Sequence, residues 1–438
     1  MLSYSVKSSN PFRIPALLSR RKLTVMMCMT ASLIITLCHG CKMLRNPDKQ
    51  NPSTRNAAGE TGGNASDAIS IHQRAISIDL HADSIQRAVD EGLDLGQALS
   101  DGHFDATRAK AGGLDAQFFS IWVEPQLFGS GGPGAINRAD KQIAAVRSLV
   151  DRYPAIWDMA TTAADVRKAS AAGKLAALMG LEGGYAIDER LENVERYYRM
   201  GVRYMSPAWT VSTSWAGSCG DEGSNRGLNE FGKQVVREMN RLGMMVDVSH
   251  VSDPTFWDVV HTSSKPVIAT HSACRAIANV PRNLTDEMIV ALAKTGGVVC
   301  VIFYPEHIEP GWAEKKRQLD AEIAPLVQRA SDAEPGDAAH KKLARDRVRR
   351  EEFAQRLPPV HVARIVDHID HIVKLVGVDH VGIGSDFDGV QALPVEMQSV
   401  ADLPNLTAEL LRRGYSEADV DKILGGNVLR LMEQVEKH

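Results

Sequence analysis

Side chains that can bind a metal ion stand at the ends of four separate apolar segments. His81 and Asp83 close the segment AISIDL, Glu182 follows LAALMGL, His250 follows MMVDVS, and His271 follows VIAT. Imidazole nitrogens and carboxylate oxygens are common ligands of zinc. Each residue alone would more often be a hydrogen-bonded structural residue or a helix cap, but their joint occurrence at strand ends favours a metal site.

The number of these ligands suits a pair of metal ions. His81 and Asp83 are two residues apart, so both side chains project to one side of a strand end. Glu182 is followed by two glycines that allow a sharp turn, and its two oxygens can bridge two ions. We therefore expect two Zn2+ ions, bridged by Glu182, which would lower the pKa of a shared water molecule.

Two further segments offer groups for proton transfer and substrate binding. Asp386, in HVGIGSDFDG, is a candidate general base and acid, with Asp388 as its competitor. Arg282 can hold a substrate carboxylate with two parallel hydrogen bonds, with Arg275 as its competitor. A turn residue and a surface ion pair are the alternative interpretations of these two positions.

The elements that must position these residues alternate between strand-like and helix-like segments. This alternation, without a hairpin signature, predicts an α/β fold with a single (β/α)8 TIM-type barrel, in which the carboxyl ends of the strands share one face. The predicted strands are Ala75–Leu80, Ala116–Trp122, Leu175–Leu181, Val202–Ser206, Met244–Val248, Val267–Thr270, Gly297–Phe303 and Val381–Gly384.

Amphipathic segments between these strands predict the surrounding helices, and one charged region interrupts the pattern. The predicted helices include Ala139–Asp151, Leu191–Met200, Gly232–Leu242, Asp286–Lys294 and Val360–Val376. Residues 306–356, after the seventh predicted strand, are rich in Ala, Lys, Glu and Arg and predict a charged helical insertion. A lid and a partner surface are possible roles, and a decoration without function is the default expectation.

The amino-terminal region has the pattern of an export signal. Arg20, Arg21 and Lys22 precede an uncharged apolar run that ends at Leu37, too short for a typical membrane span. Cys41 after Gly40 is typical of a lipidated cysteine in a bacterial lipoprotein. We predict a signal over 1–41, a polar flexible tether over 42–67 and the barrel over 68–438. The protein is thus expected to be exported, either periplasmic or anchored to a membrane.

Composition and charge limit the remaining functional classes. The 438 residues are 44% hydrophobic and carry a formal net charge of −4, so a large core is feasible and a basic nucleic-acid surface is not expected. Outside the predicted signal there are three cysteines, Cys219, Cys274 and Cys300, with no CxxC pair. They exclude a thiolate zinc site, and one disulfide remains open.

These segments together resemble the membrane dipeptidase (renal dipeptidase) family of the amidohydrolase-like barrels. The similarity extends from about Ile76 to the carboxyl terminus, and its motifs are HAD at His81, GLEGG, DVSHVSDPTFWDV, KPVIATHSACRA, VPRNLTDEMI and HVGIGSDFDG. The resemblance implies a binuclear zinc peptidase acting on dipeptides, often as a homodimer.

The resemblance also implies a role for each site residue. His81 and Asp83 would bind one zinc, His250 and His271 the other, and Glu182 both. Arg282 would bind the substrate carboxylate, and Asp386 would transfer protons. Tyr304, after the seventh predicted strand, would contact the substrate.

One position departs from the family pattern. Family members usually carry a substrate-contacting His after strand four, where this chain has Trp209, and Tyr185 stands where a His often follows the two glycines. An indole can donate one hydrogen bond but cannot become a cation. The leading hypothesis is an exported zinc dipeptidase, for L,D or D,D dipeptides among others. Hydrolysis of a lactone or N-acyl amino acid, and a zinc-bound lipoprotein without catalysis, are the alternatives.

Overall fold

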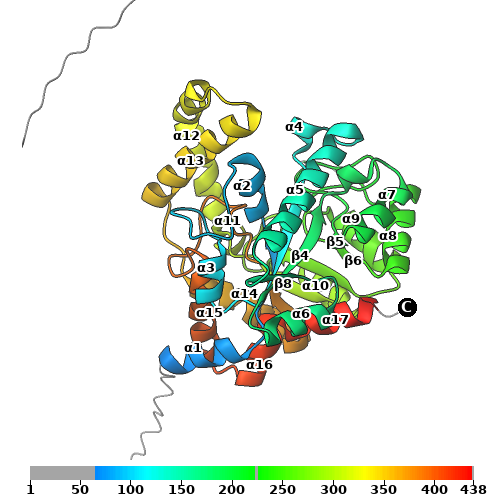
Figure 1. Cartoon of the computed structure of the whole chain (residues 1–438), viewed down its shortest axis with the longest axis vertical. Coiled ribbons are helices and arrows are strands. Elements are labelled where there is room, and N and C mark those ends of the chain that lie inside the picture. The colour runs from blue at the N-terminus through cyan, green and yellow to red at the C-terminus, as the bar shows by residue number, and fades with distance from the viewer. Residues whose placement is uncertain (1–64, 222–224, 437–438) are drawn as a thin grey trace, which may run out of the picture. The chain divides into compact units, whose positions relative to one another are not determined.

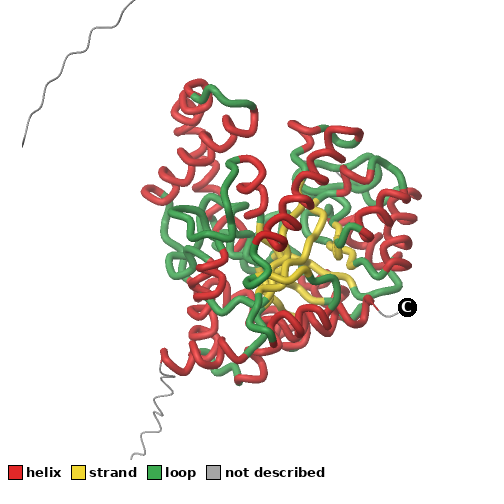
Figure 2. The backbone as a smooth tube through the Cα atoms, viewed as in Figure 1, coloured by secondary structure: helices red, strands yellow, loops and turns green. Residues whose placement is uncertain are grey.

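Parallel strands form the centre of the protein, and helices surround them (Figures 1 and 2). The computed structural model describes residues 65–221 and 225–436. The predicted signal and almost all of the predicted tether lie outside the described residues. The first described helix begins at Ala65. None of the helices within the described ranges is long and apolar enough to cross a membrane.

Nine strands build the sheet, all of them parallel to their neighbours. The neighbour order is β2-β1-β9-β8-β7-β6-β5-β4-β3, and a further pairing of β2 with β4 closes an eight-stranded barrel. The strands are β1 (Ile78–Ala82), β2 (Ala116–Trp122), β3 (Trp157–Met159), β4 (Leu175–Glu182), β5 (Val202–Met205), β6 (Met245–Asp247), β7 (Val267–Ser272), β8 (Val298–Val301) and β9 (Val381–Ile383).

The predicted barrel is confirmed, and one strand was missed. β3 pairs only with the first three residues of β4, outside the closed ring. It has just three residues, Trp157, Asp158 and Met159, and therefore lacks the apolar run by which the other strands were recognised. Its position is fixed by Trp157, which is fully buried against the core.

Helices follow the strands and cover the outside of the barrel. Their amphipathic faces supply apolar residues to a core that also includes the strands, and α6 and α17 join the strands in a second apolar cluster. The helices are α1 (Ala65–Arg74), α2 (Ser84–Asp90), α3 (Ala106–Ala111), α4 (Pro125–Phe128), α5 (Gly132–Arg152), α6 (Ala163–Ala171), α7 (Leu191–Arg199), α8 (Glu230–Leu242), α9 (Asp253–Thr262), α10 (Asp286–Lys294), α11 (Pro305–Ile308), α12 (Trp312–Ala333), α13 (Ala338–Arg356), α14 (Val362–Val376), α15 (Leu403–Arg412), α16 (Glu417–Asp421) and α17 (Asn427–Glu436).

The charged insertion is a pair of packed helices, α12 and α13, called here the α12–α13 hairpin (Trp312–Arg356). It follows β8, the seventh strand of the closed ring in chain order, as predicted. Trp312 anchors its base by donating its indole N–H to the carbonyl of Pro358 at 3.3 Å. Figure 1 shows the hairpin, in yellow, at the same end of the protein as α2 and α4.

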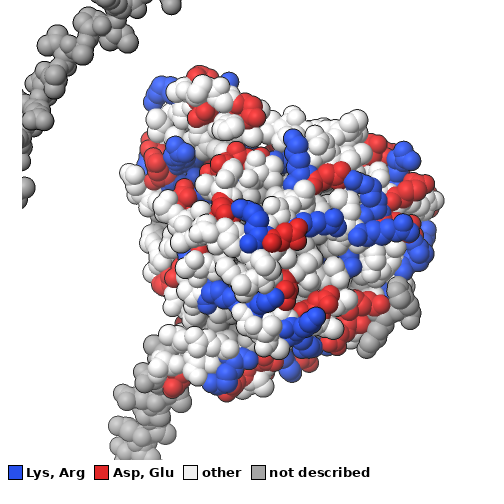
Figure 3. Space-filling view, viewed as in Figure 1, with Lys and Arg blue, Asp and Glu red and all other residues white. Residues whose placement is uncertain are grey.

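Charge is distributed without a single-sign patch on the face drawn in Figure 3, where cationic and anionic side chains alternate. The three cysteines in the described ranges, Cys219, Cys274 and Cys300, are free thiols, the last two buried. The disulfide left open by the sequence is not formed among them.

Candidate metal centre

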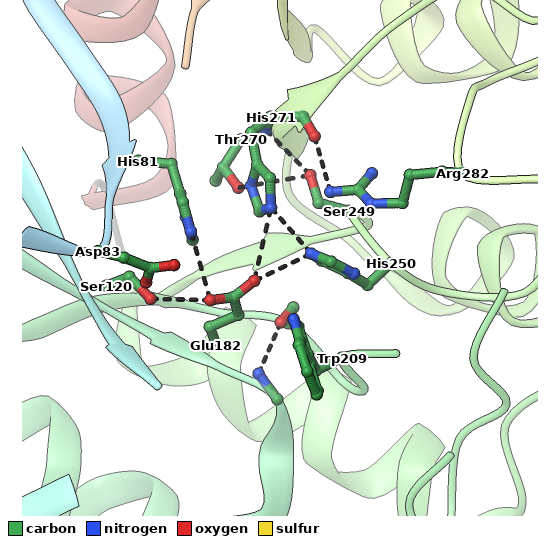
Figure 4. Close-up of polar contacts among 12 residues, drawn as sticks. His81, Asp83, Ser120, Glu182, Trp209, Ser249, His250, Thr270, His271 and Arg282 are labelled. Atoms are coloured by element: carbon green, nitrogen blue, oxygen red, sulfur yellow. Dashed lines mark hydrogen bonds and ion pairs between the residues drawn. The ribbon is translucent and has the colours of Figure 1, made fainter. Parts of the chain in front are cut away.

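Three imidazoles surround one carboxylate at the carboxyl end of the barrel (Figure 4). Oε1 of Glu182 lies 2.9 Å from Nε2 of His250 and 3.5 Å from Nε2 of His271. Oε2 of the same carboxylate lies 3.3 Å from Nε2 of His81. Each oxygen of Glu182 therefore faces a different part of the cluster, as a carboxylate shared by two ions would.

The strand ends explain this convergence. His81 and His271 lie within β1 and β7, and Glu182 is the last residue of β4. Gly183, at φ +81°, turns the chain directly after Glu182, and a Cβ there would lie 2.4 Å from the Tyr185 ring. A side chain at this position would therefore disturb the turn that follows the carboxylate.

Two site residues occupy backbone conformations that non-glycine residues rarely adopt. His250 has φ +70° and Asp386 has φ +64°. Such conformations cost free energy and persist where the surrounding structure fixes them, frequently at functional sites. Here they direct the two side chains into the cluster.

Asp83 and Asp386 complete the acidic side of the cluster. Ligand atoms of His81, Asp83 and Asp386 all lie within 4.8 Å of one another. Gly389 packs against this pair of carboxylates, since a Cβ on it would lie 2.2 Å from Oδ1 of Asp386 and 2.4 Å from Oδ2 of Asp83. Only a glycine leaves room for both acids at this place.

The donor set fits a metal ion. Nε2 of His81 is buried beside the Glu182 carboxylate and has no hydrogen-bond partner among the described residues. Nε2 of His250 and Nε2 of His271 lie 2.9 Å apart, both directed at the same carboxylate oxygen. Unpaired buried nitrogens that converge with carboxylates are costly unless a cation or a proton is shared among them.

The charges within the cluster are strongly interdependent. Burial disfavours the cationic form of His81, yet the neighbouring Glu182 carboxylate raises its pKa to about 10. Burial, with the positive charge of Arg282, lowers the pKa of His250 to about 4. Burial and the charge on His81 lower the pKa of His271. Neutral imidazoles such as these two are the form that binds metals.

Buried hydrogen bonds hold the ligands from behind. Tyr204 places its hydroxyl 2.9 Å from Nδ1 of His81, and Ser120 donates to Oε2 of Glu182 at 2.8 Å. The hydroxyl of Thr270 lies 2.8 Å from Nδ1 of His271 and donates to Asp247 at 2.8 Å. Contacts of this kind fix the orientation and tautomer of metal-binding imidazoles.

Asp386 and its competitor Asp388 have different surroundings. Asp388 accepts hydrogen bonds from the hydroxyl of Ser84 at 2.6 Å and the backbone N–H of His103 at 2.8 Å. The carboxylate of Asp386 accepts none from the described residues and faces the cluster. Burial, and repulsion by Asp83, raise its pKa well above the ordinary range. Of the two acids, Asp386 is therefore the one whose carboxylate lies within the cluster, and Asp388 is hydrogen-bonded to Ser84 and the backbone of His103.

Arg282 and its competitor Arg275 also differ in their contacts. Arg275 binds Asp253 through two ion-pair contacts, at 2.7 and 2.8 Å, away from the cluster. Arg282 is buried behind His271, where it donates to the hydroxyl of Ser272 and to the carbonyl of His271. Its Nε has no partner among the described residues, so it retains hydrogen-bonding capacity.

A cavity of about 570 Å³ opens above the cluster. Its walls include Asp83, Glu182, His250 and Asp386, together with the predicted substrate contacts Trp209 and Tyr304. The Trp209 ring lies 4.9 Å from that of Trp122 and 6.2 Å from that of His250, centroid to centroid. The hydroxyl of Tyr304 donates to Gln391 at 3.2 Å.

Sequence reasoning did not identify several residues of this site. Ser120 and Trp122, two apart at the end of β2, have the alternating spacing that places side chains on one face, and this signal was available. Tyr204 and Thr270 lie in strands already predicted. Lys342, which also lines the cavity, lies in the insertion and had no local signal.

A parallel barrel with such a cluster at its carboxyl rim defines the class of metal-dependent barrel hydrolases. Comparison with known sequences identifies the family within this class. Residues 66–438 match the family described as membrane dipeptidase, peptidase family M19. The chain belongs to that family, as its motifs had predicted.

Curated relatives agree with this assignment. The chain is 31% identical to Dipeptidase 3 of Rattus norvegicus over 341 residues, 77% of this chain and 59% of the relative. It is 30% identical to Dipeptidase tcpJ of Claviceps purpurea (strain 20.1), over 76% of this chain and 70% of the relative. The aligned region thus spans less than two thirds of the rat protein.

Solved structures show the same fold. A probable dipeptidase, PvdM from Pseudomonas aeruginosa, aligns with a TM-score of 0.72 and 27% identity, covering 85% of this chain and 98% of that one. A metallo peptidase from Rhodobacter sphaeroides, liganded with a phosphinate mimic of L-Ala-D-Ala, aligns with a TM-score of 0.67 and 25% identity. This alignment covers 82% of this chain and 99% of the Rhodobacter protein.

Proposed function

We propose that this protein is an exported dipeptidase that uses two zinc ions. The observation that carries the proposal is the Glu182 carboxylate, whose two oxygens face His81 on one side and His250 with His271 on the other. Family membership, and the dipeptide mimic bound by the Rhodobacter relative, support a dipeptide as substrate.

We assign each candidate ligand to one or both of the zinc ions. His81 and Asp83 would hold one zinc, His250 and His271 the other, and Glu182 both. When bound, the ions would supply Lewis acidity that activates water for hydrolysis. Tyr204, Ser120 and Thr270 keep the ligands oriented while substrate binds.

Other residues of the chain position the substrate and move protons. Arg282 would hold the carboxylate of the dipeptide, and Tyr304 and Trp209, which line the cavity, would contact the rest of the substrate. Burial and repulsion by Asp83 raise the pKa of Asp386, and this direction supports a role for its carboxyl in carrying a proton to the leaving amine.

The decisive experiment is hydrolysis of a panel of L,L, L,D and D,D dipeptides by the purified protein, with and without a chelator. We expect release of free amino acids that stops on chelation and returns with added zinc. Failure to cleave any dipeptide in the zinc-loaded state would rule out the proposal.

A second candidate is hydrolysis of N-acyl amino acids or lactones by the same centre. The paired indoles of Trp122 and Trp209 favour it, since their edge-to-face contact gives one wall of the cavity an apolar aromatic surface. Faster turnover of an N-acyl amino acid than of every dipeptide in the panel would support this activity over the first.

Location and assembly remain proposals that rest on the sequence. The signal over 1–41 and the lipidated Cys41 would place the enzyme in the periplasm or on a bacterial membrane, and the resemblance favours a homodimer. Mass spectrometry of the mature amino terminus and light scattering of the purified protein test these two statements.

A further inference from the structure

One face of α13 forms part of the catalytic cavity. The cavity-lining residues of this helix are Ala339, Lys342, Leu343, Asp346 and Arg350. Their spacing of three and four residues places them on a single stripe of the helix. The charged insertion therefore completes the cavity that contains the candidate metal centre.

Lys342 extends from this stripe toward the rim of the barrel. Its Nζ lies 5.6 Å from the centroid of the Trp122 ring. Trp122 is the last residue of β2 and pairs in register with Glu182, the last residue of β4. The ammonium group therefore lies near the indole that borders the shared carboxylate, on the β2 side of the cavity.

The charge of Lys342 also acts on a carboxylate just beyond the end of β2. Burial raises the pKa of Glu124, two residues after Trp122, and the charge of Lys342 opposes this rise. A carboxylate entering this part of the cavity would experience the same attraction.

Contacts within the hairpin hold the ammonium in place. Asp346, one turn further along α13, accepts from Nζ of Lys342 at 2.7 Å and is itself 3.3 Å from Arg349. An ammonium group has three N–H donors. Since Asp346 occupies one, Lys342 retains donors for a ligand and loses little conformational entropy on binding it.

The barrel defines which end of a dipeptide reaches Lys342. In the ring order β1-β2-β4-β5-β6-β7-β8-β9, the strands β2 and β7 are opposite each other. Arg282, the proposed partner of the substrate carboxylate, follows β7. If Arg282 holds the substrate carboxylate, a dipeptide cleaved at the cluster would extend its amino-terminal residue toward the β2 side, where Trp122 and Lys342 lie.

We propose that Lys342 forms a specificity subsite for a carboxylate on the side chain of the substrate's amino-terminal residue. The inference rests on the proposed dipeptidase function and names the substrate class: dipeptides that begin with an acidic residue. The aliphatic part of such a side chain would lie against the Trp122 indole, and its carboxylate would bind the ammonium.

The test compares two substrates that differ only in charge, Glu-Ala and Gln-Ala. For the wild type we expect kcat/KM to favour Glu-Ala about tenfold, the scale of one charge-assisted hydrogen bond at a partly exposed site. The ratio should fall to about one in Lys342→Gln and below one in Lys342→Glu. Lys341→Gln, a neighbouring change outside the cavity lining, should keep the wild-type ratio.

A binding measurement separates this proposal from the proposed function. Calorimetry with phosphinate mimics of Glu-Ala and Gln-Ala on the zinc-loaded protein requires no turnover. Tighter binding of the Glu mimic that depends on Lys342 would support the subsite even if no dipeptide were cleaved. Equal affinity for the two mimics, or a preference unchanged in Lys342→Gln, would overturn it.

Discussion

The two walls of the catalytic cavity are built in different ways. At the barrel rim, the candidate histidine ligands and Glu182 are buried, and hydroxyls of Tyr204, Ser120 and Thr270 support them from behind. On the α12–α13 hairpin, the charged groups are more exposed and pair largely among themselves, as Lys342 does with Asp346 and Arg356 with Glu322.

This difference assigns the chemistry to the rim and the substrate selectivity to the α12–α13 hairpin. Buried polar contacts are strong and expensive to leave unpaired, so a change at the rim affects the whole cluster. Half-exposed ion pairs are screened by water and contribute little to stability. The hairpin can therefore vary its cavity-facing residues while the rim keeps its geometry.

The largest effect is expected at the shared carboxylate. Glu182→Ala removes the carboxylate whose two oxygens face the two halves of the cluster, and several kcal/mol of transition-state stabilisation correspond to roughly 1000-fold in rate. We expect loss of dipeptidase activity and of at least one zinc per chain, measured by plasma mass spectrometry. Glu306→Ala, which alters a carboxylate in the same cavity outside the cluster, is the control. A fully active, fully loaded Glu182→Ala protein would contradict the shared-ligand assignment.

Proton transfer should be lost without loss of metal when Asp386 is changed. Asp386→Asn keeps the shape of the side chain but cannot carry the proton, so we expect kcat to fall on the order of 100-fold while zinc content is retained. Asp388→Asn is the matched comparison. Because Asp388 binds Ser84 and the backbone of His103, its replacement should lower the melting temperature and leave kcat close to the wild-type value. A large loss of kcat in Asp388→Asn, with kcat retained in Asp386→Asn, would show that Asp388 transfers the proton.

Removing a hydroxyl behind a ligand should have a smaller effect. Tyr204→Phe deletes the contact with Nδ1 of His81 and leaves the ring in place, so zinc affinity should fall about tenfold or more. Competition with a fluorescent chelator measures this change without any substrate. Lys316→Gln, a change on the hairpin side of the same cavity, should leave zinc affinity unaltered. If both variants bind zinc equally, the rim does not depend on its supporting hydrogen bonds.

The smallest effect is expected on the pH dependence of stability, at His368, which links the loop after β7 to α11 near the base of the hairpin. His368 of α14 accepts the backbone N–H of Cys274, beyond β7, and lies 2.9 Å from the carbonyl of Ile308 in α11, near the hairpin base. Burial lowers its pKa from 6.5 to about 4. In this range the unfolded chain binds the proton more readily than the folded protein does. This contribution to stability is therefore complete above pH 6.5 and is lost as the pH falls toward 4.

His368→Gln tests this link, because an amide can donate and accept without titrating. The melting temperature of the variant should depend less steeply on pH between 6.5 and 4 than that of the wild type, by a few degrees over the interval. Parallel curves for the two proteins would show that His368 does not carry this pH dependence.

Much of the barrel and its cluster followed from local sequence patterns. The apolar strands ending at His81, Glu182 and His271 were recognisable because each contains its own buried run and its own polar terminus. β3 was not recognisable, because three residues with an acid in the middle carry too little periodicity.

The sequence by itself thus determined the barrel, the candidate metal ligands and the family, since these depend on short segments whose ends must meet in a closed parallel ring. Only the tertiary structure decided that Tyr204 supports His81 and that α13 brings Lys342 to Trp122. These contacts join segments more than 100 residues apart, and no local pattern records which distant side chain will fill the space beside a given residue.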